Sequence, residues 1–334
     1  MRPVDAGLYA VRMESGSIQA RLSDLKQFLE DRLIGGAVLV ERLLIALLAD
    51  GHVLVEGSPG LAKTRAVKLL SQGLHAPFAR IQCTPDLMPA DLTGTSIWRP
   101  DSGTFEFSPG PVFHSLVLVD EINRAPPKVQ SALLEAMAES QVTAGGVTHP
   151  LPNPFMVVAT QNPIEHEGTF PLPEAQLDRF MLKVEVSLPD AATERLILDL
   201  VEGEAAGARA SVELAPIGPA EITEARRAAM AVFLSPAVKD YIVRLVTAAR
   251  RPDLYPDLAG KIEHPASPRG TLALATAAKA KAYLDGRDHV VPQDISDLAA
   301  DILSHRTILT WRALADGQRA RQVIGEFLDS VHPV

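Results

Sequence analysis

Residues 53–64 read VLVEGSPGLAKT, an apolar run followed by two glycines, a lysine and a threonine. The run is typical of a buried strand, and residues 64–74 follow a helical pattern. A glycine-bearing loop between a strand and a helix can present backbone N–H groups to a polyphosphate. The pattern G-x-x-x-x-G-K-[ST] has glycine before the lysine, whereas this chain has Ala62 there. The stretch predicts a phosphate-binding loop; the alternative is an ordinary turn with a solvated lysine.

Each residue type in this loop suits the binding of ATP and magnesium. Gly57 and Gly60 permit unusual backbone torsions and a close approach of the chain to phosphates. Lys63 supplies a cation for the β- and γ-phosphates, and the Thr64 hydroxyl can bind Mg²⁺. We therefore expect ATP and Mg²⁺ as cofactors, held by Gly57, Ser58, Pro59, Gly60, Leu61, Ala62, Lys63, Thr64 and Arg65.

Apolar runs rich in valine and isoleucine alternate with helical patterns through the first part of the chain. The runs are HVLVEG, FARIQC, SLVLVDE, FMVVATQ and MLKVEV. Strands that alternate with helices favour a parallel sheet covered on both faces, so we expect a doubly wound α/β domain. We place this domain at residues 1–204. A connection is expected at residues 205–229, where alanine, glycine and proline are frequent.

Residues 230–334 show helical spacing instead. Apolar side chains recur at i, i+3, i+4 and i+7, which predicts a small helical domain. Ser235 and Ser267 each stand before a proline, an arrangement typical of an N-cap and the first helical position. The predicted apolar faces are formed by Val238, Tyr241, Ile242 and Leu245, by Ile295, Leu298, Ala299 and Ile302, and by Ile324, Phe327, Leu328 and Val331.

Two adjacent carboxylates follow a second buried run, in LVLVDEINRA at residues 116–125. Open α/β sheets bind ligands at the carboxyl ends of their strands, where Asp120 and Glu121 are expected. Asp120 is expected to hold the Mg²⁺ that Thr64 also contacts, and Glu121 to polarise the water that attacks the γ-phosphate. The alternative is a pair of acids that caps the following turn.

Three further residues are candidates for the reaction. Asn162 ends the run FMVVATQN and can hydrogen-bond the attacking water or the γ-phosphate, although asparagine before proline is often only a turn former. Arg179 is either the partner of Asp178 in a surface ion pair or an arginine finger for a neighbouring subunit. Arg269 lies in the first turn of a predicted helix, where the helix dipole disfavours a cation, so its charge is expected to act elsewhere.

Composition and charge disfavour several classes of protein. The net charge is −9, which repels a nucleic-acid backbone. The longest apolar run, residues 37–49, contains Glu41 and Arg42 and is too short to span a membrane, so it predicts a buried amphipathic helix. The N-terminus lacks the apolar core of a secretory signal, and Cys83 is the only cysteine. We expect a cytoplasmic protein without disulfides that acts on a protein or a small molecule.

Together these motifs resemble those of the MoxR family of AAA+ ATPases, in the clade with an insertion in helix 2. GHVLVEGSPGLAKT resembles the family's Walker A region, including its alanine before the lysine, and LVLVDEINRA resembles its Walker B segment. ATQNP is similar to sensor 1, GTFPLPEAQLDRF to the arginine-finger region and ASPRG to sensor 2. Residues 89–113 resemble the helix 2 insertion, and QVTAGGVTHPLPNPF resembles the hairpin before sensor 1. The resemblance implies a P-loop AAA+ core with a parallel sheet covered by helices, and a small C-terminal all-α lid domain.

The resemblance also implies roles for individual residues. They are Lys63 and Thr64 for Walker A, Asp120 and Glu121 for Walker B, Asn162 for sensor 1, Arg179 for the finger and Arg269 for sensor 2. Arg124 is an alternative interface arginine. IGG at residues 34–36 departs from the Val-Gly-Gln that is usual near the adenine. Family members form rings, usually hexamers, and remodel proteins together with partners that bear a von Willebrand factor A-type domain.

Several functions are compatible with these motifs. Because a finger acting in trans completes the site only on assembly, the leading interpretation is a chaperone-like ATPase whose isolated protomer binds ATP but hydrolyses it poorly. One alternative is an assembly scaffold that uses ATP only as a switch. Another is a nucleic-acid motor, which would need cations on pore loops, and residues 141–154 contain no lysine or arginine. A third is an ATPase subunit like that of magnesium chelatase, over which the length and the DEINRA form favour MoxR.

Overall fold

A computed structural model describes residues 17–58, 60–163, 168–205, 214–251, 254–258 and 260–333. Pro59, one of the predicted loop residues, lies outside these ranges. Within them, no helix is long and apolar enough to cross a membrane.

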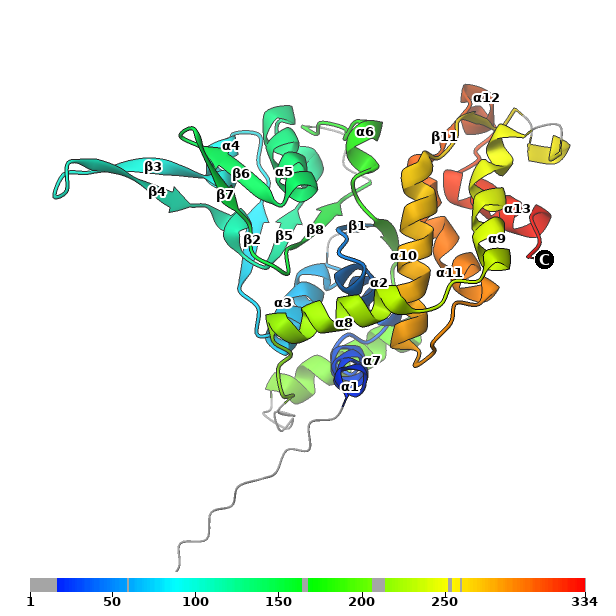
Figure 1. Ribbon diagram of the computed structural model, residues 1–334, viewed down its shortest axis with the longest axis horizontal. Helices are drawn as coiled ribbons and strands as arrows, with labels where there is room; N and C mark the ends of the chain where they lie inside the picture. The colour runs from blue at the N-terminus through cyan, green and yellow to red at the C-terminus, as the bar shows by residue number, and fades with distance from the viewer. Residues whose placement is uncertain are drawn as a thin grey trace, which may run out of the picture.

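A five-stranded parallel sheet forms the centre of the α/β part (Figure 1). The strand order across the sheet is β2-β5-β8-β1-β9. The strands are β1 (Val53–Gly57), β2 (Phe78–Gln82), β5 (Leu116–Asp120), β8 (Met156–Gln161) and β9 (Leu182–Val186). All five runs that the sequence predicted as strands are therefore strands, and their carboxyl ends meet at one edge of the sheet.

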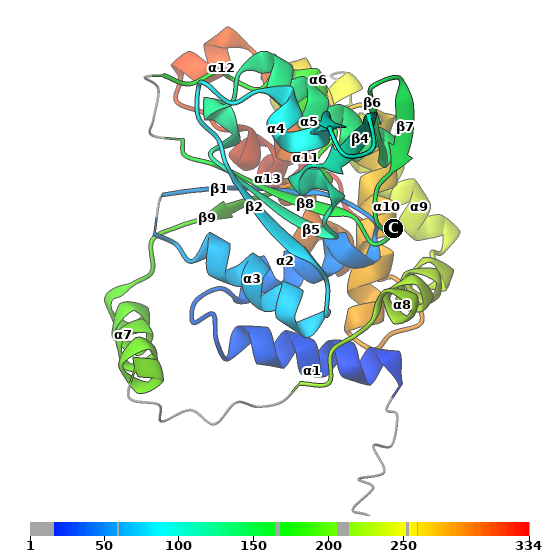
Figure 2. The same ribbon diagram turned by 90° about the vertical axis from the view of Figure 1, so that its left-hand side faces the viewer.

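Helices cover both faces of this sheet (Figure 2). On one face lie α1 (Ile18–Glu30), α2 (Ala37–Leu48) and α3 (Lys63–Gly73), and on the other lies α5 (Pro127–Glu139). Alternate strand residues serve the two faces: Val53 and Val55 pack in the core cluster that contains α1 to α3, and Leu54 packs in the cluster that contains α5. The doubly wound α/β prediction is confirmed, as is the buried helix predicted at residues 37–49.

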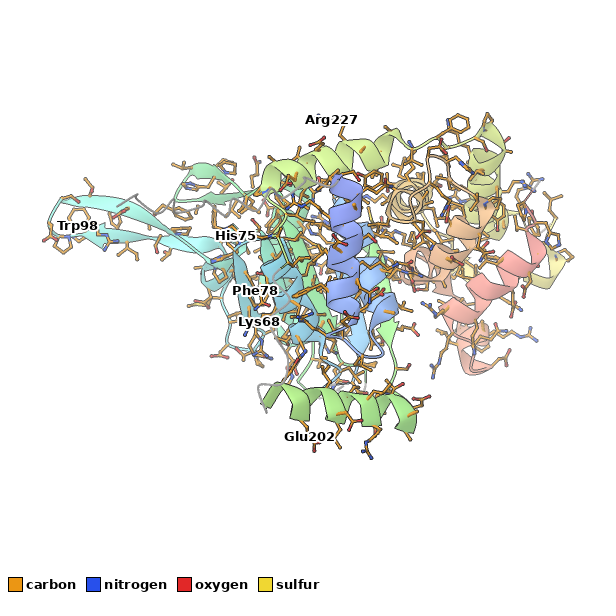
Figure 3. The ribbon with its side chains drawn as sticks, turned by 90° about the horizontal axis from the view of Figure 1, so that it is seen from below. Lys68, His75, Phe78, Trp98, Glu202 and Arg227 are labelled. Atoms are coloured by element: carbon orange, nitrogen blue, oxygen red, sulfur yellow. The ribbon has the colours of Figure 1, made fainter. Side chains whose placement is uncertain are left out.

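Two hairpins project from the sheet. The region predicted to be a helix 2 insertion forms a short helix and an antiparallel pair, and a second antiparallel pair precedes β8. Figure 1 shows the first pair extending away from the body, and Figure 3 places Trp98 far along it. The elements are α4 (Pro89–Thr93), β3 (Gly94–Arg99), β4 (Thr104–Pro109), β6 (Gln141–Ala144) and β7 (Val147–Pro150).

The C-terminal region is mainly helical and packs against the sheet domain. Its helices begin as predicted at the two Ser-Pro pairs: Ser235 Oγ accepts a hydrogen bond from Val238 N at 3.2 Å, and Ser267 Oγ accepts one from Arg269 N at 3.2 Å. Buried Arg42 of α2 donates to Asp301 at 2.7 Å, which ties this region to the core. The elements are α9 (Pro236–Thr247), β10 (Ile262–His264), α10 (Pro268–Leu284), α11 (Pro292–Leu303), β11 (Ile308–Leu309), α12 (Trp311–Ala315) and α13 (Ala320–Ser330).

Two elements in this half of the chain were not predicted from the sequence. Residues 219–231, mostly inside the predicted connection at 205–229, form α8 (Pro219–Ala231), which contacts α2 and α10. Its buried face consists of Ile222, Ala225 and Ala229. Because two of these are alanines, the hydrophobic periodicity of the segment was too weak to predict a helix. The C-terminal region is helical as predicted and also contains the short two-stranded sheet β10-β11, which the sequence did not reveal. Helices α6 (Glu174–Leu177) and α7 (Ala191–Ala205) complete the fold, and Figure 3 shows Glu202 on α7 at the periphery.

Candidate active site

The loop between β1 and α3 is shaped by its small residues. A Cβ on Gly57 would lie 2.5 Å from the carbonyl oxygen of Val186, so the chain passes too closely there for any side chain. Gly60 has φ of +86°, and Ala62 has φ of +52° directly before α3 begins at Lys63. Ala62 thus adopts the left-handed conformation at a modest energetic cost. The turn places the N-terminus of α3 beside the end of β1.

Lys63 folds back over this loop. Its Nζ donates a hydrogen bond to the carbonyl oxygen of Gly57 at 2.7 Å. Burial lowers the pKa of Lys63, while the carboxylates of Asp120, Glu121 and Glu56 act in the opposite direction. Lys63 is therefore a partly buried cation that lies beside three carboxylates at the phosphate-binding loop.

The two predicted acidic residues lie at the end of β5 and are held by their neighbours. Asp120 Oδ1 accepts a hydrogen bond from Thr160 Oγ1 at 3.2 Å, and Asp120 Oδ2 pairs with Arg80 Nε at 2.7 Å. Glu121 has φ of +57°, and its backbone N–H donates to Thr160 Oγ1 at 3.0 Å. A non-glycine residue in this conformation is a strained arrangement of the kind that is found at functional sites.

The Glu121 carboxylate also has partners. Its Oε2 accepts a hydrogen bond from Gln82 Nε2 at 3.1 Å and lies 3.3 Å from Arg124 Nε. Burial, together with the negative charges of Asp120 and Glu121, raises the pKa of the nearby Cys83 thiol to about 12. Cys83 is therefore a buried core residue, and it remains a thiol at neutral pH.

Lys63, Asp120 and Glu121 line one cleft of about 410 Å³, here named the lysine cleft. Thr64 and Asp120 both line it, and their hydroxyl and carboxylate oxygens are ligands that suit Mg²⁺, which often takes only one or two protein oxygens beside a bound phosphate. The residues present therefore fit that ion. The lining residues are Gly60, Leu61, Ala62, Lys63, Thr64, Arg65, Arg80, Gln82, Asp120, Glu121, Thr160 and Asn162.

Arg80, Gln82 and Thr160 belong to this cleft but were missed in the sequence. Arg80 and Gln82 are polar residues on β2, and Thr160 lies near the end of β8. They could have been predicted from their position near the carboxyl ends of parallel strands, because open α/β sheets bind ligands there.

Arg179 and Arg269 lie in a second cleft of about 360 Å³, here named the arginine cleft. It is lined by residues of α5, of the segment 178–181 and of α10, and it shares no lining residue with the lysine cleft. Arg179 donates to the carbonyl oxygen of Leu134, and Arg269 Nη1 lies 3.5 Å from Asp178 Oδ2. The four predicted catalytic residues are thus divided: Glu121 and Asn162 line one cleft, and Arg179 and Arg269 line the other.

Arg306, in the short 3₁₀ turn after α11, holds the arginine cleft together. Its guanidinium is buried and pairs with Asp178 Oδ1 at 2.9 Å. It also donates to the backbone carbonyls of Asp178, Phe180 and Met181 at 3.1, 2.6 and 3.1 Å. Burial lowers the pKa of Arg306 to about 10, against the opposing effect of the Asp178 carboxylate. One side chain therefore fixes the segment that carries Arg179 to the region that carries Arg269.

Comparison with known proteins identifies the class to which this fold and site belong. Residues 52–182 match the ATPase family associated with various cellular activities (AAA), and residues 259–327 match the AAA lid domain. A putative ATPase from Cytophaga hutchinsonii has a similar solved structure, with a TM-score of 0.85 and 41% identity over 95% of this chain and 96% of that one. The chain therefore has the AAA+ ATPase architecture of a sheet domain and a lid.

The chain belongs to the MoxR family within this class. It is 44% identical to chaperone MoxR1 of Mycobacterium tuberculosis over 90% of this chain and 78% of that protein. It is 35% identical to protein MoxR of Methylorubrum extorquens over 83% of this chain and 84% of that protein. The family resemblance and the fold class expected from the sequence motifs are both confirmed.

Proposed function

We propose that this protein hydrolyses ATP at the lysine cleft of one subunit and the arginine cleft of the next, and that it uses the energy to remodel partner proteins. The division of Glu121 and Asn162 from Arg179 and Arg269 between two clefts of one chain is the observation that carries this proposal. Membership of a family of ATPases supports the reaction, and a relative named as a chaperone supports the remodelling role.

Within the lysine cleft the residues predicted from the sequence divide between binding of the nucleotide and attack by water. Lys63 and the N-terminus of α3 bind the terminal phosphates, with Gly57, Ser58, Gly60, Leu61, Ala62 and Arg65 forming the surrounding loop. Thr64 and Asp120 would hold Mg²⁺, which neutralises charge on the phosphates when bound. Glu121 takes the proton of the attacking water, and Asn162 orients that water.

Glu121 must be released before it can act as the base. Its carboxylate contacts Gln82 and Arg124, so ATP binding and subunit contact have to redirect those partners toward other groups. Arg124 is therefore a second candidate for an arginine that faces a neighbouring subunit.

The arginine cleft supplies positive charge from the adjoining subunit. In the assembly we propose, Arg179 reaches the γ-phosphate bound by a neighbour and stabilises the charge that develops on it, while Arg269 adds a second cation from the lid. A closed ring, which the family resemblance suggests is a hexamer, gives every lysine cleft such a neighbour.

The proposed partner rests on the family resemblance alone, and the proposed cellular setting rests on the sequence of the N-terminus. On that basis we propose a cytoplasmic protein that works with a partner bearing a von Willebrand factor A-type domain. Domain limits at residues 204 and 230 remain part of this proposal, with α8 assigned to the connection between the two domains.

The test is steady-state ATP hydrolysis with Mg²⁺ across a wide range of protein concentration. Specific activity that rises with concentration and is lost in Lys63→Ala supports a site shared between subunits. Activity that is independent of concentration contradicts sharing. Tight ATP binding without turnover at any concentration favours the use of ATP as a switch instead.

A further inference from the structure

Arg80 of β2 lies among the acidic residues of the lysine cleft, and the proposed mechanism gives it no role. Its Nε lies 2.7 Å from Asp120 Oδ2, and its Nη2 donates to Gln82 Oε1 at 3.2 Å. Gln82 in turn donates to Glu121, so Arg80 is linked to both acidic residues that the reaction uses. About half of its side chain, 52%, is exposed, and it lines the cleft.

The strand register directs Arg80 toward the lysine cleft. In the pairing of β2 with β5, Arg80 lies opposite Leu118 and Gln82 lies opposite Asp120. Paired residues of neighbouring strands point to the same face of a sheet. Leu118 belongs to the core cluster on the face covered by α3, and α3 is the helix whose first residue is Lys63. Arg80 and Lys63 therefore converge on the same cleft from a strand and from a helix.

Arg80 and a divalent cation compete for the same carboxylate. Oδ1 of Asp120 accepts the Thr160 hydroxyl, and Oδ2 is paired with the Arg80 guanidinium. A guanidinium next to a divalent cation is repelled, so Mg²⁺ at Asp120 displaces Arg80. The freed guanidinium remains on β2 at the lysine cleft, next to the phosphates of a bound nucleotide.

We propose that Arg80 is a phosphate-binding residue that leaves Asp120 for the terminal phosphate when Mg²⁺ and ATP bind. This inference rests on the proposed function and deepens it. The planar guanidinium can donate two parallel hydrogen bonds to phosphate oxygens. Because Arg80 is linked to the acidic residues that face the reacting phosphate, it contacts the γ-phosphate, which ADP lacks. Arg80 therefore makes the cleft prefer ATP to ADP.

The test is equilibrium binding of ATP and of ADP, each with Mg²⁺, to the full chain and to Arg80→Ala. A lost charge-assisted contact lowers ATP affinity about tenfold, and ADP affinity changes by less than about twofold. Arg99→Ala is the matched control, because Arg99 is 53% exposed and also pairs with a carboxylate, Glu106, at 2.7 Å on the distant hairpin. That variant should bind both nucleotides like the unmodified protein.

Repeating the comparison in an Asp120→Asn background separates a phosphate contact from simple pairing with Asp120. If Arg80 binds phosphate, Arg80→Ala still lowers the ratio of ATP to ADP affinity in that background. If Arg80 only balances the charge of Asp120, the substitution leaves the ratio unchanged in both backgrounds, and the inference is wrong. If the unmodified protein binds neither nucleotide, the proposed function itself fails. Arg80→Lys, which keeps the charge but not the fork, should give an intermediate ratio.

Discussion

The lysine cleft and the arginine cleft are built in different ways. The first lies at the carboxyl ends of parallel strands, and its residues come from the loop after β1, from the start of α3, from β2, and from the ends of β5 and β8. The second lies where the sheet domain meets the lid, and its residues come from the segment 49–52, from α5, from the segment 178–181, from α10 and from the turn at Arg306. In the proposed function the lysine cleft binds ATP and activates water, whereas the arginine cleft contributes the cations of Arg179 and Arg269. On this proposal each chain carries two complementary parts of one reaction site.

Replacing Arg179 is expected to have the largest effect on turnover. Loss of an arginine finger costs about a thousandfold or more in kcat, so Arg179→Ala should nearly abolish hydrolysis while ATP still binds in the intact lysine cleft. The comparison uses kcat and the ATP dissociation constant of the same preparation. Arg195→Ala is the control, because Arg195 is an exposed arginine of α7 paired with Asp199. A large loss of ATP affinity in Arg179→Ala would place Arg179 in the cleft of its own subunit.

Glu121→Gln should affect the lysine cleft alone. Removal of a general base lowers kcat by about a hundredfold or more, and glutamine preserves the shape of the side chain. We therefore expect bound ATP to accumulate, which a filter-binding assay or single-turnover experiment detects. Turnover equal to that of the unmodified protein would remove Glu121 from the mechanism.

Arg306→Lys should disturb the geometry of the arginine cleft without changing the residues that bind the nucleotide. Lysine cannot reproduce the forked contacts that Arg306 makes with Asp178 and with the carbonyls of residues 178, 180 and 181. We expect kcat to fall about tenfold because Arg179 and Arg269 lose their fixed separation, with ATP affinity unchanged. Arg321→Lys, at a lid arginine that pairs with Asp301, is the control. Equal losses of kcat in the two variants would indicate a general effect on lid stability.

A smaller effect concerns the pH dependence of stability near the arginine cleft. Buried His52 accepts a hydrogen bond from Val157 N at its Nδ1 and contacts Met137 O at its Nε2, so the folded protein needs the neutral ring. Burial lowers the pKa of His52 from 6.5 to about 4. Between pH 6.5 and pH 4 the unfolded chain therefore binds more protons than the folded protein. The free energy of unfolding consequently decreases as the pH falls from 6.5 toward 4. Protonation of His52 alone should lower the free energy of unfolding by about 2 kcal/mol between pH 7 and pH 5.

Urea unfolding at the two pH values measures this contribution. His52→Gln keeps an acceptor and a donor but does not titrate, so its free energy of unfolding should fall less on acidification than that of the unmodified protein. Parallel losses in both proteins would show that His52 does not titrate in this range.

The two clefts also differ in how far the sequence revealed them. The residues of the lysine cleft come in short contiguous motifs that follow apolar runs, so Lys63, Thr64, Asp120, Glu121 and Asn162 could be predicted together. The arginine cleft depends on contacts between distant segments. Arg306 binds carbonyls more than 120 residues earlier in the chain, and no local pattern marks such a contact.

The fold shows the same distinction between local and distant signals. The five strands were predicted because each is a continuous apolar run, and the two Ser-Pro helix starts because capping is local. Helix α8 was missed because its buried face includes alanines, and β10-β11 because its strands contain only three and two residues. The pairing of Arg80 with Asp120 depends on the register of β2 against β5, which the sequence does not specify.

The most direct test of a site shared between subunits is to mix two inactive variants. Glu121→Gln keeps an intact arginine cleft, and Arg179→Ala keeps an intact lysine cleft. In randomly mixed rings about a quarter of the interfaces join the two intact clefts, so ATP hydrolysis should return on mixing although each variant alone is inactive. If the variants assemble together and the mixture remains inactive, the two clefts do not form one site across the interface, and the account is contradicted.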